Sequence, residues 1–171
     1  MFEVVRLSAG DLRFTVGNYV VGVERKTWGD LIGACRQRQN GGMRFLQQVN
    51  RQLALYDISV VLMDGGYRVR DMEDGVYDKQ GNVELDTFGT NLGGITIWDR
   101  QNREWRAVAP SGLYTADAAL LRAQEMGAFV VHNPEPELLG PRVHYLVNYF
   151  KAHGEEFVNA RNLAEQRRGT G

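Results

Sequence analysis

The dipeptide Gly17-Asn18 lies between two apolar, strand-like stretches at residues 12–16 and 19–26. Glycine and asparagine readily adopt the positive φ angles that a two-residue hairpin turn requires. The pattern therefore predicts an antiparallel hairpin in which residue 16 faces residue 19. Because hairpin register follows from the length of the turn, this short segment also fixes which side chains meet further along both strands.

The predicted register brings charged side chains together at the open end of the hairpin. Continued outward, it places Asp11 opposite Glu24, and Lys26 lies two residues further on, on the same face as Glu24. Two carboxylates directly across strands repel each other, so the pair needs a compensating positive charge. Lys26 supplies one charge, and a divalent cation bound by both carboxylates would supply more. Oxygen ligands of this kind suit Mg²⁺ or Mn²⁺.

The same three residues are compatible with metal-dependent cleavage of a phosphodiester. The metal would polarise the phosphate and lower the pKa of a bound water, while the lysine would orient that water or stabilise developing charge. The alternative is that Asp11 is a turn residue after Gly10, and that Glu24 and Lys26 form an exposed strand face.

The rest of the chain predicts an α/β domain with a mixed sheet. Thr27 is a candidate N-cap, with Asp30 three residues later as in a capping box. Residues 66–110 form a polar, β-rich insertion with a hairpin that places Trp98 across from Trp105. The other predicted elements are strands at 2–7, 58–63 and 128–132, and helices at 28–39, 43–55, 116–126 (capped by Thr115 and closed by Gly127), 141–153 and 155–166, with Gly154 ending the penultimate helix and a frayed tail from about 167.

Composition favours one soluble domain spanning residues 1–171. The net charge of −1 gives no general case for nucleic acid, although a local basic patch can suffice. Only three of the 20 basic residues are lysines, and arginine is the better bidentate phosphate ligand. The single cysteine, Cys35, fits a reducing compartment, and the sequence has neither a signal-peptide pattern nor an apolar run of membrane-spanning length. We therefore expect a cytoplasmic protein without a membrane partner.

The stretch around Glu24 resembles the XPF-type structure-specific endonucleases, a branch of the PD-(D/E)XK superfamily. That branch carries G-D and then E-R-K-x-x-x-D, and the matching residues are Gly10-Asp11, Glu24-Arg25-Lys26 and Asp30. The segment MRFLQQVNRQL is similar to the family's G-R-x-x-x-Q-x-x-R-L, with Met43 where the glycine usually stands. Its polar residues share one helical face and are Arg44, Gln48 and Arg51. The resemblance covers residues 5–65.

The resemblance implies a PD-(D/E)XK restriction-endonuclease-like core, with a mixed central sheet flanked by helices. It implies a metal-dependent endonuclease for branched DNA of the fork, flap or Holliday-junction type, active in repair, recombination or replication. Asp11 and Glu24 would bind Mg²⁺ or Mn²⁺, Lys26 would assist the attacking water, and Arg25 and Asp30 would organise the site. Strand alternation points Arg25 to the opposite face, so an ion pair with Asp30 that stabilises the fold is the alternative. An acid is also favoured at the position of Asp30 simply because a helix begins there.

Two features depart from the family pattern. The family usually carries a further acid on a preceding strand, and Glu3 is the one acid upstream of Asp11. The residues after position 153 are too few for the family's helix-hairpin-helix modules, so we expect DNA to be held elsewhere. The candidates, which could instead be a solvated helix face and a self-stabilised hairpin, are Arg36, Arg38, Arg44, Gln48 and Arg51, and Arg100, Arg103 and Arg106 beside the two tryptophans.

These expectations together describe a homodimeric, resolvase-like enzyme, nucleoid-associated in the cytoplasm of a bacterial or phage-infected cell. One rival is a catalytically inactive nuclease-fold protein that binds DNA or acts as a scaffold. Another is a nuclease with a different role, either sequence-specific or nicking.

Overall fold

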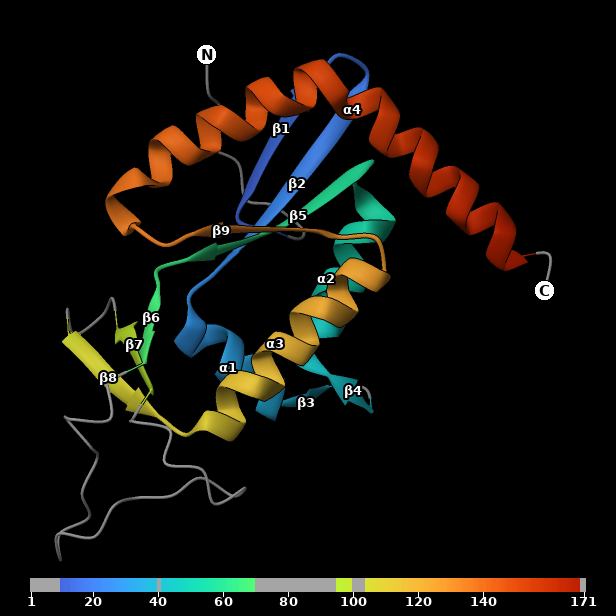
Figure 1. The fold of residues 1–171 in the computed structure, drawn as a ribbon. Helices are drawn as coiled ribbons and strands as arrows, with labels where there is room; N and C mark the ends of the chain where they lie inside the picture. The colour runs from blue at the N-terminus through green and yellow to red at the C-terminus, as the bar shows by residue number, and fades with distance from the viewer. Residues whose placement is uncertain (1–9, 40, 70–94, 100–103, 170–171) are drawn as a thin grey trace, which may run out of the picture.

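A mixed four-stranded sheet lies at the centre of the computed structural model, which describes residues 10–39, 41–69, 95–99 and 104–169 (Figure 1). Its strand order is β1-β2-β5-β9. β1 (Leu12–Val16) runs antiparallel to β2 (Tyr19–Lys26), whereas β5 (Ile58–Asp64) and β9 (Phe129–Asn133) run parallel to β2. The predicted α/β architecture with a mixed sheet is confirmed. The strand predicted at residues 2–7 lies outside the described residues.

The β1–β2 hairpin has the predicted register. Val16 pairs with Tyr19, and the pairing continues without a slip to Leu12 and Val23. Gly17 has a φ of +57°, as a two-residue hairpin turn demands at its first position. Asp11 precedes β1 and donates its backbone N–H to the carbonyl of Val23 at 2.8 Å, which keeps it against the end of β2.

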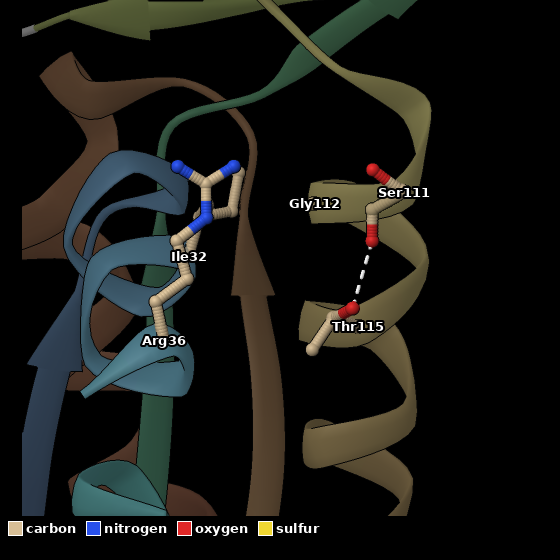
Figure 2. A pocket seen from close by; sticks show the side chains of 5 residues that line it. All are labelled: Ile32, Arg36, Ser111, Gly112 and Thr115. Atoms are coloured by element: carbon tan, nitrogen blue, oxygen red, sulfur yellow. Dashed lines mark hydrogen bonds between the residues drawn. The ribbon is translucent and has the colours of Figure 1, made fainter. Parts of the chain in front are cut away.

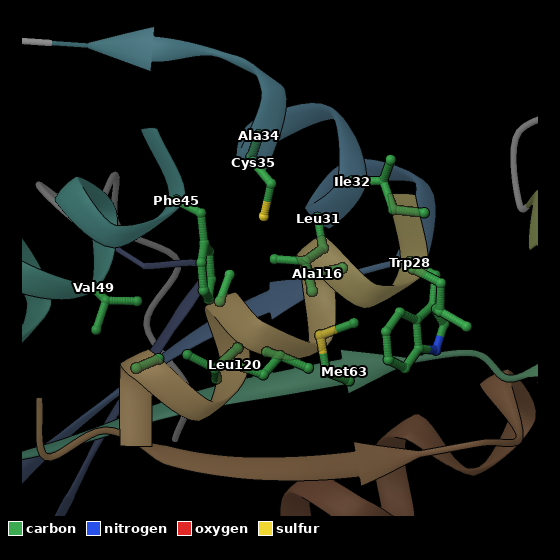
Figure 3. Packing of buried hydrophobic residues seen from close by; sticks show 14 of the residues in the cluster. Trp28, Leu31, Ile32, Ala34, Cys35, Phe45, Val49, Met63, Ala116 and Leu120 are labelled. Carbon is green, nitrogen blue, oxygen red and sulfur yellow. The ribbon is translucent and has the colours of Figure 1, made fainter. Parts of the chain in front are cut away.

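Three helices cover one face of the sheet: α1 (Trp28–Arg36), α2 (Arg44–Leu55) and α3 (Pro110–Glu125). Their apolar sides meet β5 in a buried cluster, in which Leu31, Phe45 and Met63 point into the same space and are fully buried (Figure 3). Burial of each such side chain stabilises the fold by about 1.5–3 kcal/mol. This cluster fixes α1 and α2 above the sheet, on the face to which Glu24 and Lys26 point.

A single long helix, α4 (Leu139–Gly169), covers the opposite face and follows a 3₁₀ turn, η2 (Pro136–Leu138). Its buried residues Leu146 and Phe150 pack with apolar side chains of β2 and β5. The predicted end at Gly154, the separate helix 155–166 and the tail from 167 are wrong, because α4 is continuous. A Cβ atom at Gly154 would lie 3.3 Å from Cδ2 of Tyr19. The glycine therefore allows close packing on β2 and does not end the helix.

Two other helix boundaries differ from the prediction. α1 ends at Arg36, because Arg38–Gln39 forms a short strand, β3, that pairs with β4 (Gly42–Met43). α3 begins at Pro110, and the Thr115 hydroxyl donates to the Ser111 carbonyl at 2.7 Å inside the helix. Proline fits the first helical position because its missing N–H has no partner there anyway.

A small antiparallel sheet lies between β5 and α3 in the chain. It comprises β6 (Tyr67–Val69), β7 (Ile95–Asp99) and β8 (Glu104–Val108). Trp98 pairs with Trp105, and the two rings pack edge to face with centroids 5.5 Å apart, as predicted. In the described part of the chain, no helix has the length and apolar character needed to cross a membrane.

Candidate functional site

Polar and charged side chains gather where the parallel strands end. Glu24 and Lys26 lie in the last three residues of β2, Asp64 ends β5, and Asn133 ends β9. Because these strands are parallel, their carboxyl ends share one edge of the sheet, where α/β sheets usually bind ligands. Asp11 reaches the same edge from the start of the antiparallel strand β1.

Glu24 and Lys26 form an ion pair on the α1–α2 side of the sheet. Lys26 Nζ lies 2.6 Å from Glu24 Oε1, and the side chains are 14% and 9% exposed. A short charge-assisted contact between two largely buried groups holds both of them in place. The shared face agrees with the strand alternation read from the sequence.

Asp11 is exposed and approaches this end of β2 from solvent. Its Oδ2 accepts a hydrogen bond of 2.8 Å from the backbone N–H of Arg25. Gly10, with a φ of +78°, turns the chain away at this point, so the Asp11 carboxylate satisfies a donor that β1 no longer reaches. The two predicted metal-binding acids therefore lie at the same end of β2, one exposed and one buried.

The side chain of Arg25 points to the opposite face, as its place in β2 predicts. Its guanidinium binds Oδ2 of Asp64 through both Nε, at 2.7 Å, and Nη2. Asn133 holds the other oxygen of Asp64 at 2.8 Å and also donates to the carbonyl of Glu135 at 3.0 Å. The predicted Arg25–Asp30 ion pair is wrong, and Asp64 is the counter-charge.

Asp30 serves the start of α1. Its N–H donates to the Thr27 hydroxyl at 3.2 Å, and that hydroxyl donates to Asp30 Oδ2 at 2.8 Å. The predicted cap is thus confirmed, and it accounts for an acid at this position. The exposed Asp30 also lines a cavity together with Lys26, so it borders the site while capping the helix.

This cavity continues into a basic groove between α1 and α2. Lys26 and Asp30 line one end, and a second hollow extends it toward β3. We call the two together the α1–α2 groove. The predicted DNA-binding residues that line it are Arg38, Arg44, Gln48 and Arg51. Arg44 is oriented by a hydrogen bond to the Gln37 side chain. The groove therefore joins four predicted DNA ligands to the Glu24–Lys26 pair.

Of the other predicted DNA ligands, Arg36 lies outside this groove. Arg36 projects from the other side of α1 toward α3 and lines a small cavity with Ser111 and Thr115 (Figure 2). Arg106 of β8 is exposed and lies 3.7 Å from Asp99, and its Nη2 would be 3.3 Å from a Cβ atom at Gly29, a residue that lines the groove. Arg100 and Arg103 lie outside the described residues. The predicted clustering of Arg36 with the other helix arginines is therefore wrong.

Three buried polar residues near the site were not singled out from the sequence. Asp64 is 3% exposed, Asn133 0% and Gln52 1%. Asp64 carries a recognisable signal, because it is the polar residue that ends the buried apolar run of β5. Asn133 follows the exposed His132 in β9 and carries no such signal. Gln52 lies four residues after Gln48 and so on the same side of α2, which is the one sequence cue to its position.

Asp11 and Glu24 supply two carboxylates, which suits an ion such as Mg²⁺ that keeps water ligands better than an ion that needs four or more protein ligands. Among the described residues, no group of three or more His, Cys, Asp or Glu side chains is placed to share a metal ion. Mg²⁺ is commonly bound by one or two carboxylates and keeps several waters. Oδ2 of Asp11 and Oε1 of Glu24 are engaged, which leaves one oxygen of each carboxylate for such an ion.

In comparisons with known proteins, the chain matches no family model, and no curated protein and no solved structure is significantly similar to it. Its function therefore has to be inferred from its own side chains.

Proposed function

We propose that the chain is a metal-dependent endonuclease that hydrolyses phosphodiester bonds in branched or structured DNA, on a PD-(D/E)XK-type core. One observation carries the proposal. Lys26 Nζ contacts Glu24 Oε1 at 2.6 Å at the carboxyl end of β2, where Lys26 also borders the basic α1–α2 groove. A cation, an acid and a run of arginines along one groove are the groups that phosphodiester cleavage requires.

The side chains divide the chemistry between them. Asp11 and Glu24 would hold Mg²⁺ or Mn²⁺ with their remaining oxygens, together with water. When bound, the ion polarises the phosphate and lowers the pKa of a coordinated water. Lys26, fixed by Glu24, would orient the attacking water and stabilise the negative charge that develops on the phosphate oxygens.

DNA would lie along the α1–α2 groove. Arg44 and Arg51 are exposed there and would neutralise phosphates on either side of the scissile bond. Such binding is largely independent of sequence and weakens steeply with salt. Arg25 would act indirectly, because its backbone N–H holds Asp11 while its side chain is tied to Asp64.

The test is cleavage of fork, flap, four-way-junction and linear duplex DNA with Mg²⁺ or Mn²⁺. We expect wild type to cut the branched substrates, and Glu24→Gln and Lys26→Met each to lower the rate by about 100-fold or more, the usual effect of removing one transition-state contact. Glu125→Gln, in an exposed acid of α3, is the matched control and should cut as wild type does. A wild type that does not cut, or equal rates in all variants, would refute the assignment.

A second candidate is a non-catalytic DNA-binding protein with the same fold. It is favoured by the structural contacts of the two acids, since Glu24 neutralises Lys26 and Asp11 satisfies the Arg25 amide. In that case Arg51→Ala would lower DNA affinity and its salt dependence, Arg36→Ala would change neither, and no substrate would be cut. Cleavage by the wild type, measured together with DNA binding by these two variants, therefore separates the two functions.

A further inference from the structure

Gln52 of α2 presents a buried amide that no described residue satisfies. Only 1% of its surface is exposed, and neither Oε1 nor Nε2 forms a hydrogen bond within the described part of the chain. Unsatisfied buried amides are destabilising, and natural proteins retain few of them without a water or an ion as partner. The position of this amide is therefore informative.

The amide lies against the corner from which Asp11 projects. A Cβ atom at Gly10 would be 2.7 Å from Nε2 of Gln52 and 3.0 Å from the Val23 carbonyl oxygen. Only a glycine leaves room for the Gln52 amide at this point. Gln52 is thus packed beside the residue that precedes the exposed carboxylate.

The residues on either side of Gln52 in α2 show how this helix runs along β2. One helical turn after Gln52, the Tyr56 ring lies directly over Gly22, and one turn before it, Gln48 borders the same cavity as Lys26. Four helical residues span about 6 Å and two strand residues about 6.6 Å. Positions 48, 52 and 56 therefore have nearly the same spacing as positions 26, 24 and 22 of β2. From this spacing we infer that Gln52 lies at the level of Glu24, between Gly22 and Lys26.

We propose that Gln52 is a positioning residue of the metal site, and this rests on the proposed function. Its amide would hydrogen-bond the water shell of a divalent cation held by Asp11 and Glu24. Metal-bound waters donate hydrogen bonds, and the amide oxygen can accept them. Since Mg²⁺ keeps several waters, such an outer contact is the natural role for an amide beside two carboxylates. Oε1 of Gln48 is also buried and without a partner in the described chain, and Gln48 lines the neighbouring cavity.

The experiment is a calorimetric titration of the full chain with Mn²⁺, combined with thermal melting in the absence of metal. Gln52→Met should bind Mn²⁺ at least about tenfold more weakly, the usual effect of losing an outer-shell partner. Without metal it should melt no lower than wild type, because it replaces an unsatisfied amide with an apolar side chain of similar size. Gln52→Glu keeps an oxygen acceptor and should bind Mn²⁺ more tightly than Gln52→Met.

Two further variants separate the possible outcomes. Ser59→Ala is the matched control, because its hydroxyl is also buried and without a partner in the described chain but lies beside Gly22, away from the edge. It should bind Mn²⁺ as wild type does, whereas Glu24→Gln should lose binding. Equal affinity in wild type and Gln52→Met, with binding lost in Glu24→Gln, overturns the role of Gln52 alone. No binding by wild type, or full binding by Glu24→Gln, overturns the metal site as well.

Discussion

Replacing Gly22 by alanine tests the contact that sets α2 above β2. A Cβ atom at Gly22 would lie 2.0 Å from Cδ2, 2.3 Å from Cε2 and 2.6 Å from Cγ of Tyr56, closer than the 3.0 Å that real Cβ atoms respect. Because Cγ is bonded directly to the Cβ atom of Tyr56, the ring cannot make room by moving its far end. Either the end of α2 or the whole ring has to shift.

The cost follows from these two possibilities. Overpacking a closed core costs about 1–3 kcal/mol, and loss of a buried aromatic side chain costs about 3–5 kcal/mol. Tyr56 is 7% exposed, so it has little free space to enter. We expect Gly22→Ala to lower the free energy of unfolding by about 3 kcal/mol, where both ranges meet. For a domain of this size, that change lowers the melting temperature by about 6–12 °C.

Urea unfolding at equilibrium measures the effect. Gly33→Ala is the control, because nothing lies within 4 Å of a Cβ at Gly33 and alanine favours the helix interior. It should raise the free energy of unfolding by about 0.5–1 kcal/mol. In a Tyr56→Ala background, the cost of Gly22→Ala should fall below about 1 kcal/mol, because the methyl group then occupies vacated space. A wild-type midpoint for Gly22→Ala, or an equal cost in both backgrounds, would refute the reasoning.

Two further predictions concern buried groups outside the groove. Asp64→Ala should lower the free energy of unfolding, measured in urea, by about 2–4 kcal/mol, because it leaves the Arg25 guanidinium without its counter-charge while only 29% of that side chain reaches solvent. A loss below about 1 kcal/mol would contradict a stabilising ion pair. Burial raises the pKa of Cys35 from 9.0 to about 11, so the thiol stays neutral at pH 8 and should react with a disulfide reagent only on unfolding. The thiol ionises at a lower pH in the unfolded chain than in the folded protein. The stability that the neutral thiol contributes is therefore fully present below pH 9 and is lost as the pH rises through about 11. In Cys35→Ala the urea midpoint should fall less over this pH range.

The features that the sequence predicts correctly are those that short-range geometry determines. A two-residue turn at Gly17-Asn18 sets the hairpin register, and one helical turn joins Thr27 to Asp30. The alternation of β2 then assigns Glu24 and Lys26 to one face and Arg25 to the other. None of these relations depends on how distant segments pack.

The wrong predictions concern residues whose role is set by a neighbour and not by the preference of the residue itself. Gly154 matches the preference for glycine after a helix, but its buried position against Tyr19 of β2 is what requires it. Threonine is a common N-cap residue, yet the helix begins at Pro110, about one turn before Thr115, and the Thr115 hydroxyl donates to the Ser111 carbonyl inside the helix. In both cases a correct local preference was outweighed by a neighbour that the local pattern does not contain.

The candidate site divides along the same line. Strand periodicity indicates which β2 side chains share a face, but it cannot identify what lies over that face. The counter-charge of Arg25 comes from β5, and the amide beside Gly10 comes from α2. The height and register of α2 depend on the Gly22–Tyr56 contact, a glycine and an aromatic with no chemical role of their own. A motif can therefore point to Glu24 and Lys26, whereas Gln52 becomes a candidate only when the packing of α2 on β2 is known.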